Sequence, residues 1–242
     1  MTYNATTKQV ETISGLGRWP SAISIDWYRD NFGGDMPDGI PRSVTPAAIA
    51  AWLDALARGG TMTFAEVAAP ALALAEEGFP VYPRLASMIA AEAKALPAWP
   101  SSLPTFQPNG RAPREREVWR QPELANTIRM LIEAERGAAH REAGLEAARR
   151  RFYEGDIAER IARFSIEQAG LLNGDDLASF RVGHEAPVSV NYRDFEVFAC
   201  GPWCQGPMIP QTLQILSGYD LPALGHNSAD YLHTLTECAK LA

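Results

Sequence analysis

Cysteine and long apolar stretches are scarce in this sequence of 242 residues. It holds 3 cysteines, Cys200, Cys204 and Cys238, so at least one thiol stays unpaired and no disulfide framework holds the fold together. We expect buried, structural thiols instead.

No stretch approaches the roughly 18 apolar residues of a membrane span, and the N-terminus lacks the basic start and apolar run of a signal peptide. These absences argue against a membrane partner. They slightly favour the cytoplasm, with the periplasm as the alternative if the natural chain begins upstream of Met1.

An excess of basic charge is also missing. Lys and Arg total 22 against 29 Asp and Glu, a formal net charge of -7. Nothing in this balance attracts phosphate backbones, so no nucleic-acid partner is expected. The densest basic run, residues 149–151, has Glu146 and Glu154 nearby, which predicts an exposed helix face. With 46% hydrophobic and 21% charged residues, the chain is typical of one soluble globular domain over residues 1–242.

Common catalytic and metal motifs are absent too. Neither Gly-x-Ser-x-Gly nor Ser-x-x-Lys occurs, and there is no phosphate-binding loop. The spacing of Cys200 and Cys204, with His184 and His226 elsewhere, matches no common zinc site. We therefore expect no metal and no cofactor. Removal of Met1 would expose Thr2, whose amine can act as base for its own hydroxyl, and the residues alone leave this possibility open.

The hydrophobic pattern is mostly helical. Thr45 as N-cap and Pro46 predict a helix that ends at Gly59, and Thr63 with Glu66 predicts a capping box for a helix that ends at Gly78, with a kink or break at Pro70. Further helices are expected at 83–96, within 121–151 with a solvated middle at 134–150, at 155–168, at 209–216 and from about 227 to the C-terminus. Period-two patterns predict a strand at 8–13 and a hairpin within 188–199, and Gly/Pro-rich turns are expected at 31–41, 97–104 and 200–207.

Several phrases taken together carry a family resemblance. They lie at residues 5–10, 44–52, 68–81, 152–158, 170–180, 187–193, 211–216 and 226–229. In combination they resemble the large subunit of the gamma-glutamyltransferase family, and the resemblance covers essentially the whole chain. The family's members are N-terminal nucleophile hydrolases with a four-layer αββα sandwich.

The resemblance implies an α/β (α+β) fold, predominantly helical here, in which this chain is a partial large subunit truncated at both ends relative to the family. In the family a precursor cleaves itself, and the new N-terminal Thr of the small subunit is the nucleophile. The resemblance therefore places no catalytic residue in this chain, puts Thr2 inside a strand, and names the small subunit of the same precursor as the partner. It also predicts that the sandwich is incomplete within these residues.

Two positions depart from the family pattern. The family places an Arg four residues before the proline that corresponds to Pro20, where it holds the substrate's α-carboxylate, and here that place is Leu16. Arg18 is the arginine nearest to it and is our candidate substrate-binding residue; the alternative is that Arg18 stacks on Trp19 or lies in solvent. The family's Pro-Pro-Pro-Ser-Ser-Gly-Gly run is replaced at residues 201–207 by Gly-Pro-Trp-Cys-Gln-Gly-Pro. Both departures fit the acylase-like branch of the family.

The resemblance implies an autoprocessed, heterodimeric amidohydrolase or acyltransferase, such as a glutathione hydrolase of glutathione metabolism or a related acylase, acting on a γ-glutamyl or similar acyl amide. This chain alone is expected to be inactive. The alternative is a degenerate, non-catalytic binding or structural relative.

Overall fold

The computed structural model describes residues 1–242, and the chain divides into two compact units. One unit is continuous, residues 17–180, and the other combines residues 1–16 with residues 181–242. About 53% of the residues are helical. None of the helices has the length and apolar character needed to cross a membrane.

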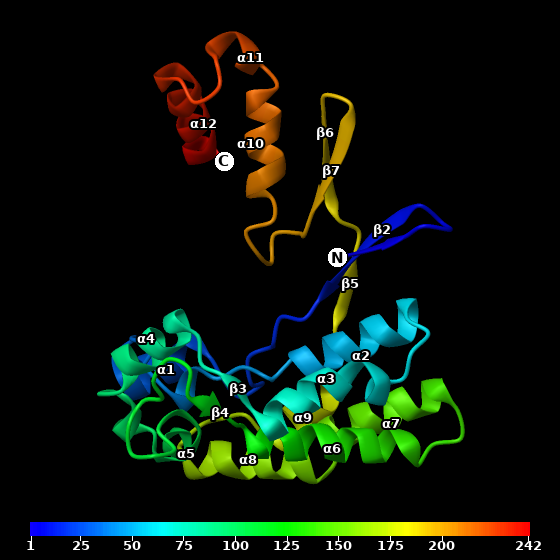
Figure 1. Ribbon diagram of the computed structural model, residues 1–242, viewed down its shortest axis with the longest axis vertical. Coiled ribbons are helices and arrows are strands. Elements are labelled where there is room, and N and C mark those ends of the chain that lie inside the picture. Colours follow the sequence, from blue (N-terminus) through cyan, green and yellow to red (C-terminus); the bar gives the residue numbers. More distant parts are fainter. The chain divides into compact units, whose positions relative to one another are not determined.

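The unit of residues 17–180 is built almost entirely of helices (Figure 1). Its α-helices are α1 (Ile25–Phe32), α2 (Ala48–Gly59), α3 (Phe64–Glu77), α4 (Pro83–Glu92), α5 (Leu103–Phe106), α6 (Pro122–Arg136), α7 (Arg141–Tyr153), α8 (Asp156–Glu167) and α9 (Gly174–Ser179). Short 3-10 turns occur at η1 (Ile40–Arg42), η2 (Leu96–Ala98) and η3 (Pro100–Ser102), and β3 (Phe79–Pro80) pairs antiparallel with β4 (Val118–Trp119).

The core of this unit lies along α6 and α7, which pack against each other and contact α3, α2, α8 and α9. Leu131 of α6 and Ala148 and Tyr153 of α7 are completely buried. The Tyr153 hydroxyl donates to the Pro46 carbonyl over 2.7 Å and accepts from the Ala50 N–H over 3.1 Å. Burial raises the pKa of Tyr153. This hydroxyl therefore ties the end of α7 to the beginning of α2.

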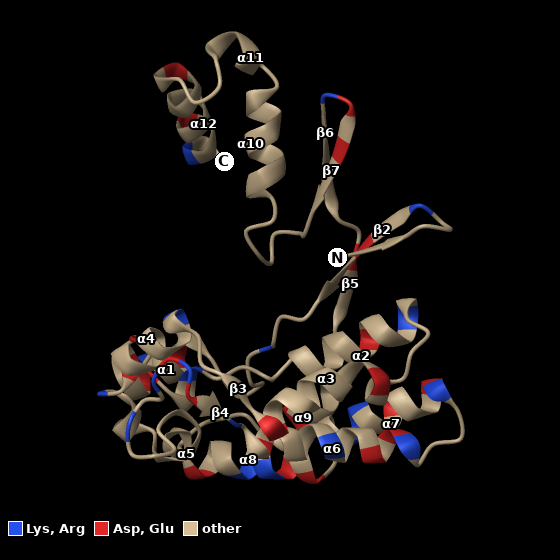
Figure 2. Cartoon of the chain, in the orientation of Figure 1, with Lys and Arg blue, Asp and Glu red and all other residues tan.

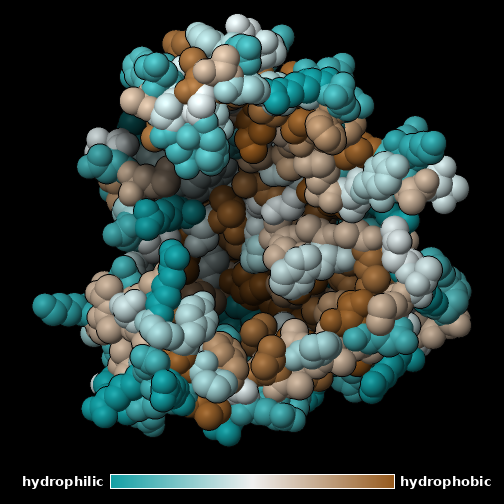
Figure 3. Space-filling view, turned by 45° about the horizontal axis from the view of Figure 1, so that its top comes forward, coloured by the Kyte–Doolittle hydropathy of each residue, from teal (hydrophilic) through white to brown (hydrophobic).

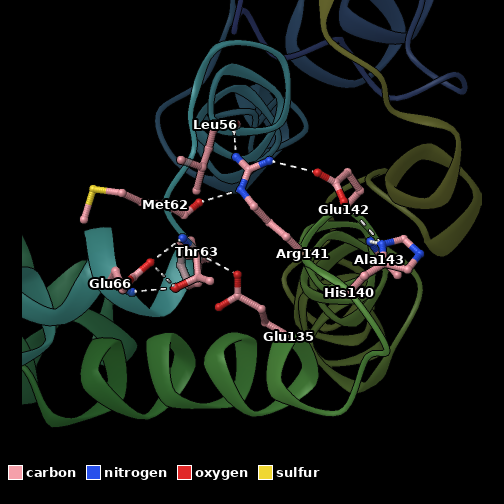
Figure 4. Close-up of polar contacts among 10 residues, drawn as sticks. Leu56, Met62, Thr63, Glu66, Glu135, His140, Arg141, Glu142 and Ala143 are labelled. Carbon is pink, nitrogen blue, oxygen red and sulfur yellow. Dashed lines mark hydrogen bonds and ion pairs between the residues drawn. The ribbon is translucent and has the colours of Figure 1, made fainter.

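A polar network joins α2, α3, α6 and α7 around the beginning of α3 (Figure 4). Thr63 and Glu66 form the expected capping box. The buried carboxylate of Glu135 on α6 accepts from the next two backbone N–H groups, those of Phe64 at 2.5 Å and Ala65 at 2.7 Å. A helix N-terminus has unpaired N–H groups and positive potential, so a carboxylate from a neighbouring helix stabilises it.

The second unit contains two small antiparallel sheets and three helices. The first sheet has the order β1-β2-β5, with β1 (Thr2–Asn4), β2 (Gln9–Ser14) and β5 (Gly183–Glu185); the second is a hairpin of β6 (Val188–Tyr192) and β7 (Phe195–Ala199). Helix α10 (Met208–Leu216) packs on the hairpin and on α12 (Ala229–Leu241), and α11 (Leu221–Leu224) contacts α12.

Most of the elements expected from the pattern are confirmed. The hairpin turns at Arg193 and Asp194, between Tyr192 and Phe195, which face each other in the register. Ser228 caps the last helix by accepting from the Tyr231 N–H. The strands do not close into a two-sheet sandwich within the chain, as expected.

Other expectations are wrong. Thr45 is not an N-cap, because helix α2 begins at Ala48. Thr45 is buried, and its N–H donates to the Arg18 carbonyl. Of the kink or break expected at Pro70, the break is absent, because helix α3 continues through Pro70 to Glu77. Helix α4 ends at Glu92 rather than residue 96, and short helical turns fill much of 97–104. Helices α1 and α9 were not expected.

The helix expected to be solvated at 134–150 is also different. It is interrupted between α6 and α7, and α7 is central to the core because small residues such as Ala148 let its neighbours approach closely. Arg149 is not on an exposed face. Its side chain is only 12% exposed and pairs with Glu146 at 2.9 Å and Glu154 at 2.5 Å.

We predict that Tyr153→Phe lowers the free energy of unfolding by about 1 to 3 kcal/mol, because the Ala50 N–H loses its acceptor and the Pro46 carbonyl its donor in a buried place. Chemical denaturation measures the change. The matched control is Tyr82→Phe, since Tyr82 is 54% exposed and its hydroxyl has no partner in the chain. Equal stability of the two variants would contradict the assigned role of the Tyr153 hydroxyl.

Candidate functional site

The segment around the candidate residue Arg18 is fixed by backbone contacts. Gly17 lies so close to the Thr45 carbonyl that a Cβ at Gly17 would overlap with that oxygen. The Thr45 N–H donates to the Arg18 carbonyl over 2.9 Å. Residue 17 is therefore restricted to glycine by close approach, and the backbone of Arg18 is held against the chain just before α2.

The other end of the segment is held by Asp176, in the first turn of α9. Pro20 is buried, and the Ser21 N–H donates to Asp176 Oδ1 over 2.9 Å. Asp176 is only 9% exposed, and its other oxygen accepts from the Asn173 N–H as part of a capping box. The carboxylate thus caps its own helix and also anchors residue 21, 155 positions away in sequence.

The side chain of Arg18 itself is exposed and makes no hydrogen bond or ion pair with the rest of the chain. It does not stack on its neighbour. The Trp19 ring instead packs edge-on against Tyr28, 6.5 Å between centroids, and the Tyr28 hydroxyl donates to the Pro41 carbonyl. A free guanidinium on a fixed backbone is chemically suited to bind a carboxylate through two parallel hydrogen bonds.

The remaining residues singled out by the sequence lie in the other unit. Leu16 is 57% exposed, and the division between the units falls directly after it. Thr2 lies in β1, paired with Glu11 of β2, so it lies within a strand as the family resemblance implies.

The turn at residues 200–207 is held by side chains. The Trp203 indole N–H donates to the Glu185 carboxylate over 2.9 Å, and the Glu185 carbonyl accepts from the buried Thr12 hydroxyl. The Cys204 sulfur accepts from the Gly206 N–H over 3.3 Å. Gly206 approaches the backbone of Cys200 so closely that no Cβ would fit there. The turn is therefore closely packed.

The three cysteines do not share one environment. Cys238 is buried in a cluster with Leu216 and Leu221, as expected for a structural thiol. Cys200 is half-buried and Cys204 is exposed, so the expectation of buried thiols is wrong for Cys204. No group of three or more His, Cys, Asp or Glu side chains has the arrangement of a metal site.

Sequence reasoning missed the anchoring role of Asp176. The pattern Asn173-x-x-Asp176 is a readable capping-box signal, which would have located the beginning of α9. Nothing in the local sequence indicates that the same carboxylate binds Ser21, because that contact depends on the tertiary fold.

Comparison with known proteins identifies the family. The model of the family described as gamma-glutamyltranspeptidase matches residues 1–242. The chain belongs to this family. It is 30% identical over 241 residues to a glutathione hydrolase-like YwrD proenzyme of Bacillus subtilis, and 34% identical over 241 residues to an acylase ACY 1 proenzyme of a Pseudomonas species. These alignments cover 99% and 95% of this chain but only 43% and 41% of the relatives.

Solved structures agree with this assignment. The crystal structure of cephalosporin acylase from Bacillus halodurans matches with a TM-score of 0.85 and 29% identity, over 96% of this chain and 42% of that one. Helicobacter pylori gamma-glutamyltranspeptidase has the same fold, with a TM-score of 0.82 at 22% identity, over 96% of this chain and 68% of that one. The fold is thus that of the N-terminal nucleophile hydrolases of this family. The chain spans less than half the length of the curated relatives named above.

We predict that Asp176→Ala destabilises the fold by about 1.5 to 3 kcal/mol, because two backbone N–H groups lose a charged acceptor. Hydrogen exchange at the Ser21 amide is expected to accelerate beyond what global unfolding explains. The control is Asp175→Ala in the same helical turn, since the Asp175 carboxylate is exposed and receives no hydrogen bond from the chain. If the two variants exchange Ser21 at the same rate, Asp176 does not anchor the Arg18 segment.

Proposed function

We propose that the complete protein is an amidohydrolase or acyltransferase of the N-terminal nucleophile type, acting on a γ-glutamyl or related acyl amide. The observation that carries the proposal is the family assignment together with coverage: the relatives are glutathione hydrolase and acylase proenzymes, and this chain spans only part of them. The nucleophilic Thr would then lie on a small subunit from the same precursor, outside these residues.

The thin core of the unit made of residues 1–16 and 181–242 supports a partner subunit. Its buried apolar cluster consists of Leu216, Leu221 and Cys238. Large apolar side chains stay open, with Phe195 72% and Ile209 57% exposed. Figure 2 shows that α10 carries no charged residue, and Figure 3 shows patches of apolar side chains at the surface among hydrophilic ones. Exposed apolar surface of this kind is typical of a surface that is covered in an assembly.

The chemistry of such an enzyme proceeds in two steps. The Thr hydroxyl attacks the amide carbonyl, with its proton passing to the threonine's own amine, and the C–N bond breaks to release an amine and leave an acyl ester. Water then releases the acid, or a second amine takes the acyl group. In this scheme the present chain contributes the walls of the substrate site and groups that bind the substrate, but not the nucleophile.

Arg18 is the binding group that we assign to the substrate carboxylate. Its backbone is fixed by Thr45 on one side and, through Ser21, by Asp176 on the other, and its guanidinium has no internal partner. The fixed backbone leaves only the side chain to be ordered on binding, and the planar guanidinium can bind a carboxylate through two hydrogen bonds. This supports Arg18 in the role that the family gives to the arginine at the position of Leu16.

We predict that the 242-residue chain alone does not hydrolyse γ-glutamyl anilides, because it lacks the proposed nucleophile. Release of the coloured aniline is the measurement, with the complete precursor as positive control. Hydrolysis by the short chain that disappears in Thr2→Ala would contradict the proposal and return the nucleophile to Thr2.

In the complete protein, Arg18→Ala is expected to lower kcat/KM roughly tenfold to a hundredfold for a substrate that carries the carboxylate, since a charge-assisted pair is lost. A matched substrate without the carboxylate should lose little. The control is Arg160→Ala, an exposed arginine that also lacks a partner in the chain. An equal loss on both substrates, or no loss on either, would remove Arg18 from the site.

The alternative is that the protein is a degenerate relative that binds but does not catalyse. One directly observable feature distinguishes it from an enzyme. An enzyme of this type needs a threonine that becomes N-terminal after cleavage of the sequence downstream of Ala242. Expressing the longer reading frame and sequencing the N-termini of its products distinguishes the two. A product that begins with Thr supports the enzyme, whereas an uncleaved chain supports the degenerate relative.

A further inference from the structure

A pocket of about 570 Å³ opens between the η1 turn and the C-terminal end of α4, within the unit of residues 17–180. Its lining includes Gly39 and Arg42 from the first side and Glu92 and Trp99 from the second. The volume lies within the range of small-molecule sites. Neither the family resemblance nor the proposed function uses any of these residues.

An indole ring forms one wall of the pocket. Gly39 has φ +96°, a conformation that favours glycine, and a Cβ at this residue would overlap with the Trp99 ring. The bare backbone of Gly39 therefore lets the ring pack directly against it. Trp99 is half-buried and has no hydrogen-bond or aromatic partner on its side chain. An indole placed in this way offers a flat face to an apolar group or to a cation.

The wall at the end of α4 carries a carboxylate that has no partner in the chain. Glu92 is the last residue of α4, it has no ion-pair or hydrogen-bond partner for its carboxylate, and the last turn of the helix holds no basic residue. Lys94 follows two residues later, but it does not line the pocket. This wall is suited to an ammonium group.

Donors for a carboxylate lie on the η1 side. Arg42 uses Nη2 in an ion pair with Asp38 at 2.5 Å, and its other guanidinium nitrogens have no partner in the chain. The hydroxyl of Ser43, which also lines the pocket, is likewise unpaired. A guanidinium has five N–H donors, so Arg42 can hold Asp38 and a ligand carboxylate together.

We propose that this pocket binds a free α-amino acid with an apolar or aromatic side chain. The ammonium group lies at Glu92 and the end of α4, the carboxylate at Arg42 and Ser43, and the side chain against Trp99. The Glu92 carboxylate has no partner in the chain, and Arg42 keeps unused N–H donors beside its ion pair with Asp38, which also lines the pocket, so each charge of the ligand finds a partner. The inference goes beyond the proposed function, because binding here needs no nucleophile and no partner subunit.

Isothermal titration of the 242-residue chain with L-phenylalanine tests the proposal. The comparison ligands are N-acetyl-phenylalanine, which lacks the ammonium charge, and phenylalanine amide, which lacks the carboxylate. We expect the zwitterion to bind at least about tenfold more tightly than either, since each analogue loses one charged contact. Absence of binding, or an analogue that binds as tightly as phenylalanine, would overturn the proposal.

Variants locate the site. Glu92→Gln, an exposed and nearly isosteric change, is expected to weaken phenylalanine binding at least about tenfold, and Trp99→Leu is expected to weaken it as well. Glu77→Gln at the end of α3 serves as control, because Glu77 is also an exposed, unpaired carboxylate near a helix C-terminus. Circular dichroism confirms that the variants are folded. If Glu92→Gln binds phenylalanine as well as Glu77→Gln does, the amino acid is not held in this pocket.

Discussion

The Tyr153 hydroxyl fixes the entrance to α2, and the candidate site is built on that entrance. By bonding the Pro46 carbonyl and the Ala50 N–H, it determines where the chain enters the helix. One residue earlier, the Thr45 N–H holds the Arg18 carbonyl. A side chain from the centre of the core thus helps to position the backbone of Arg18 through two backbone contacts. Because Tyr153 is completely buried, its position is closely restricted, and the backbone of the Arg18 segment is anchored to the core through it.

How much could be predicted from the sequence depended on the range of the interaction. The capping box of Thr63 and Glu66 and the Ser228 cap lie within one helical turn, so local pattern was sufficient. Thr45 has the same local signature of a cap, but its side chain is buried and its N–H binds Arg18, so α2 begins later. Local propensity was overridden there by tertiary contacts.

The site shows the same limit. The candidate Arg18 came from a family resemblance, whereas its anchor Asp176 came only from the structure. The resemblance gave residue types at positions, and it could not show that the Asp176 carboxylate caps α9 and binds Ser21 at once. The burial of α7 was missed for a related reason. A run rich in Ala, Glu and Arg looks solvated in the sequence, but small residues such as Ala148 let one face of the helix pack against other helices.

The turn at 200–207 bears on the choice between an enzyme and a degenerate relative. If the departure of residues 201–207 from the family's run of prolines and serines had left the turn without fixed contacts, it would favour the non-catalytic relative. Instead Trp203 binds Glu185, whose strand is in turn bonded by Thr12, and Gly206 packs directly on Cys200. A side-chain hydrogen bond and a close backbone contact constrain this turn. The altered sequence is therefore no argument for a loose turn, and a closely packed turn is compatible with the proposed enzyme.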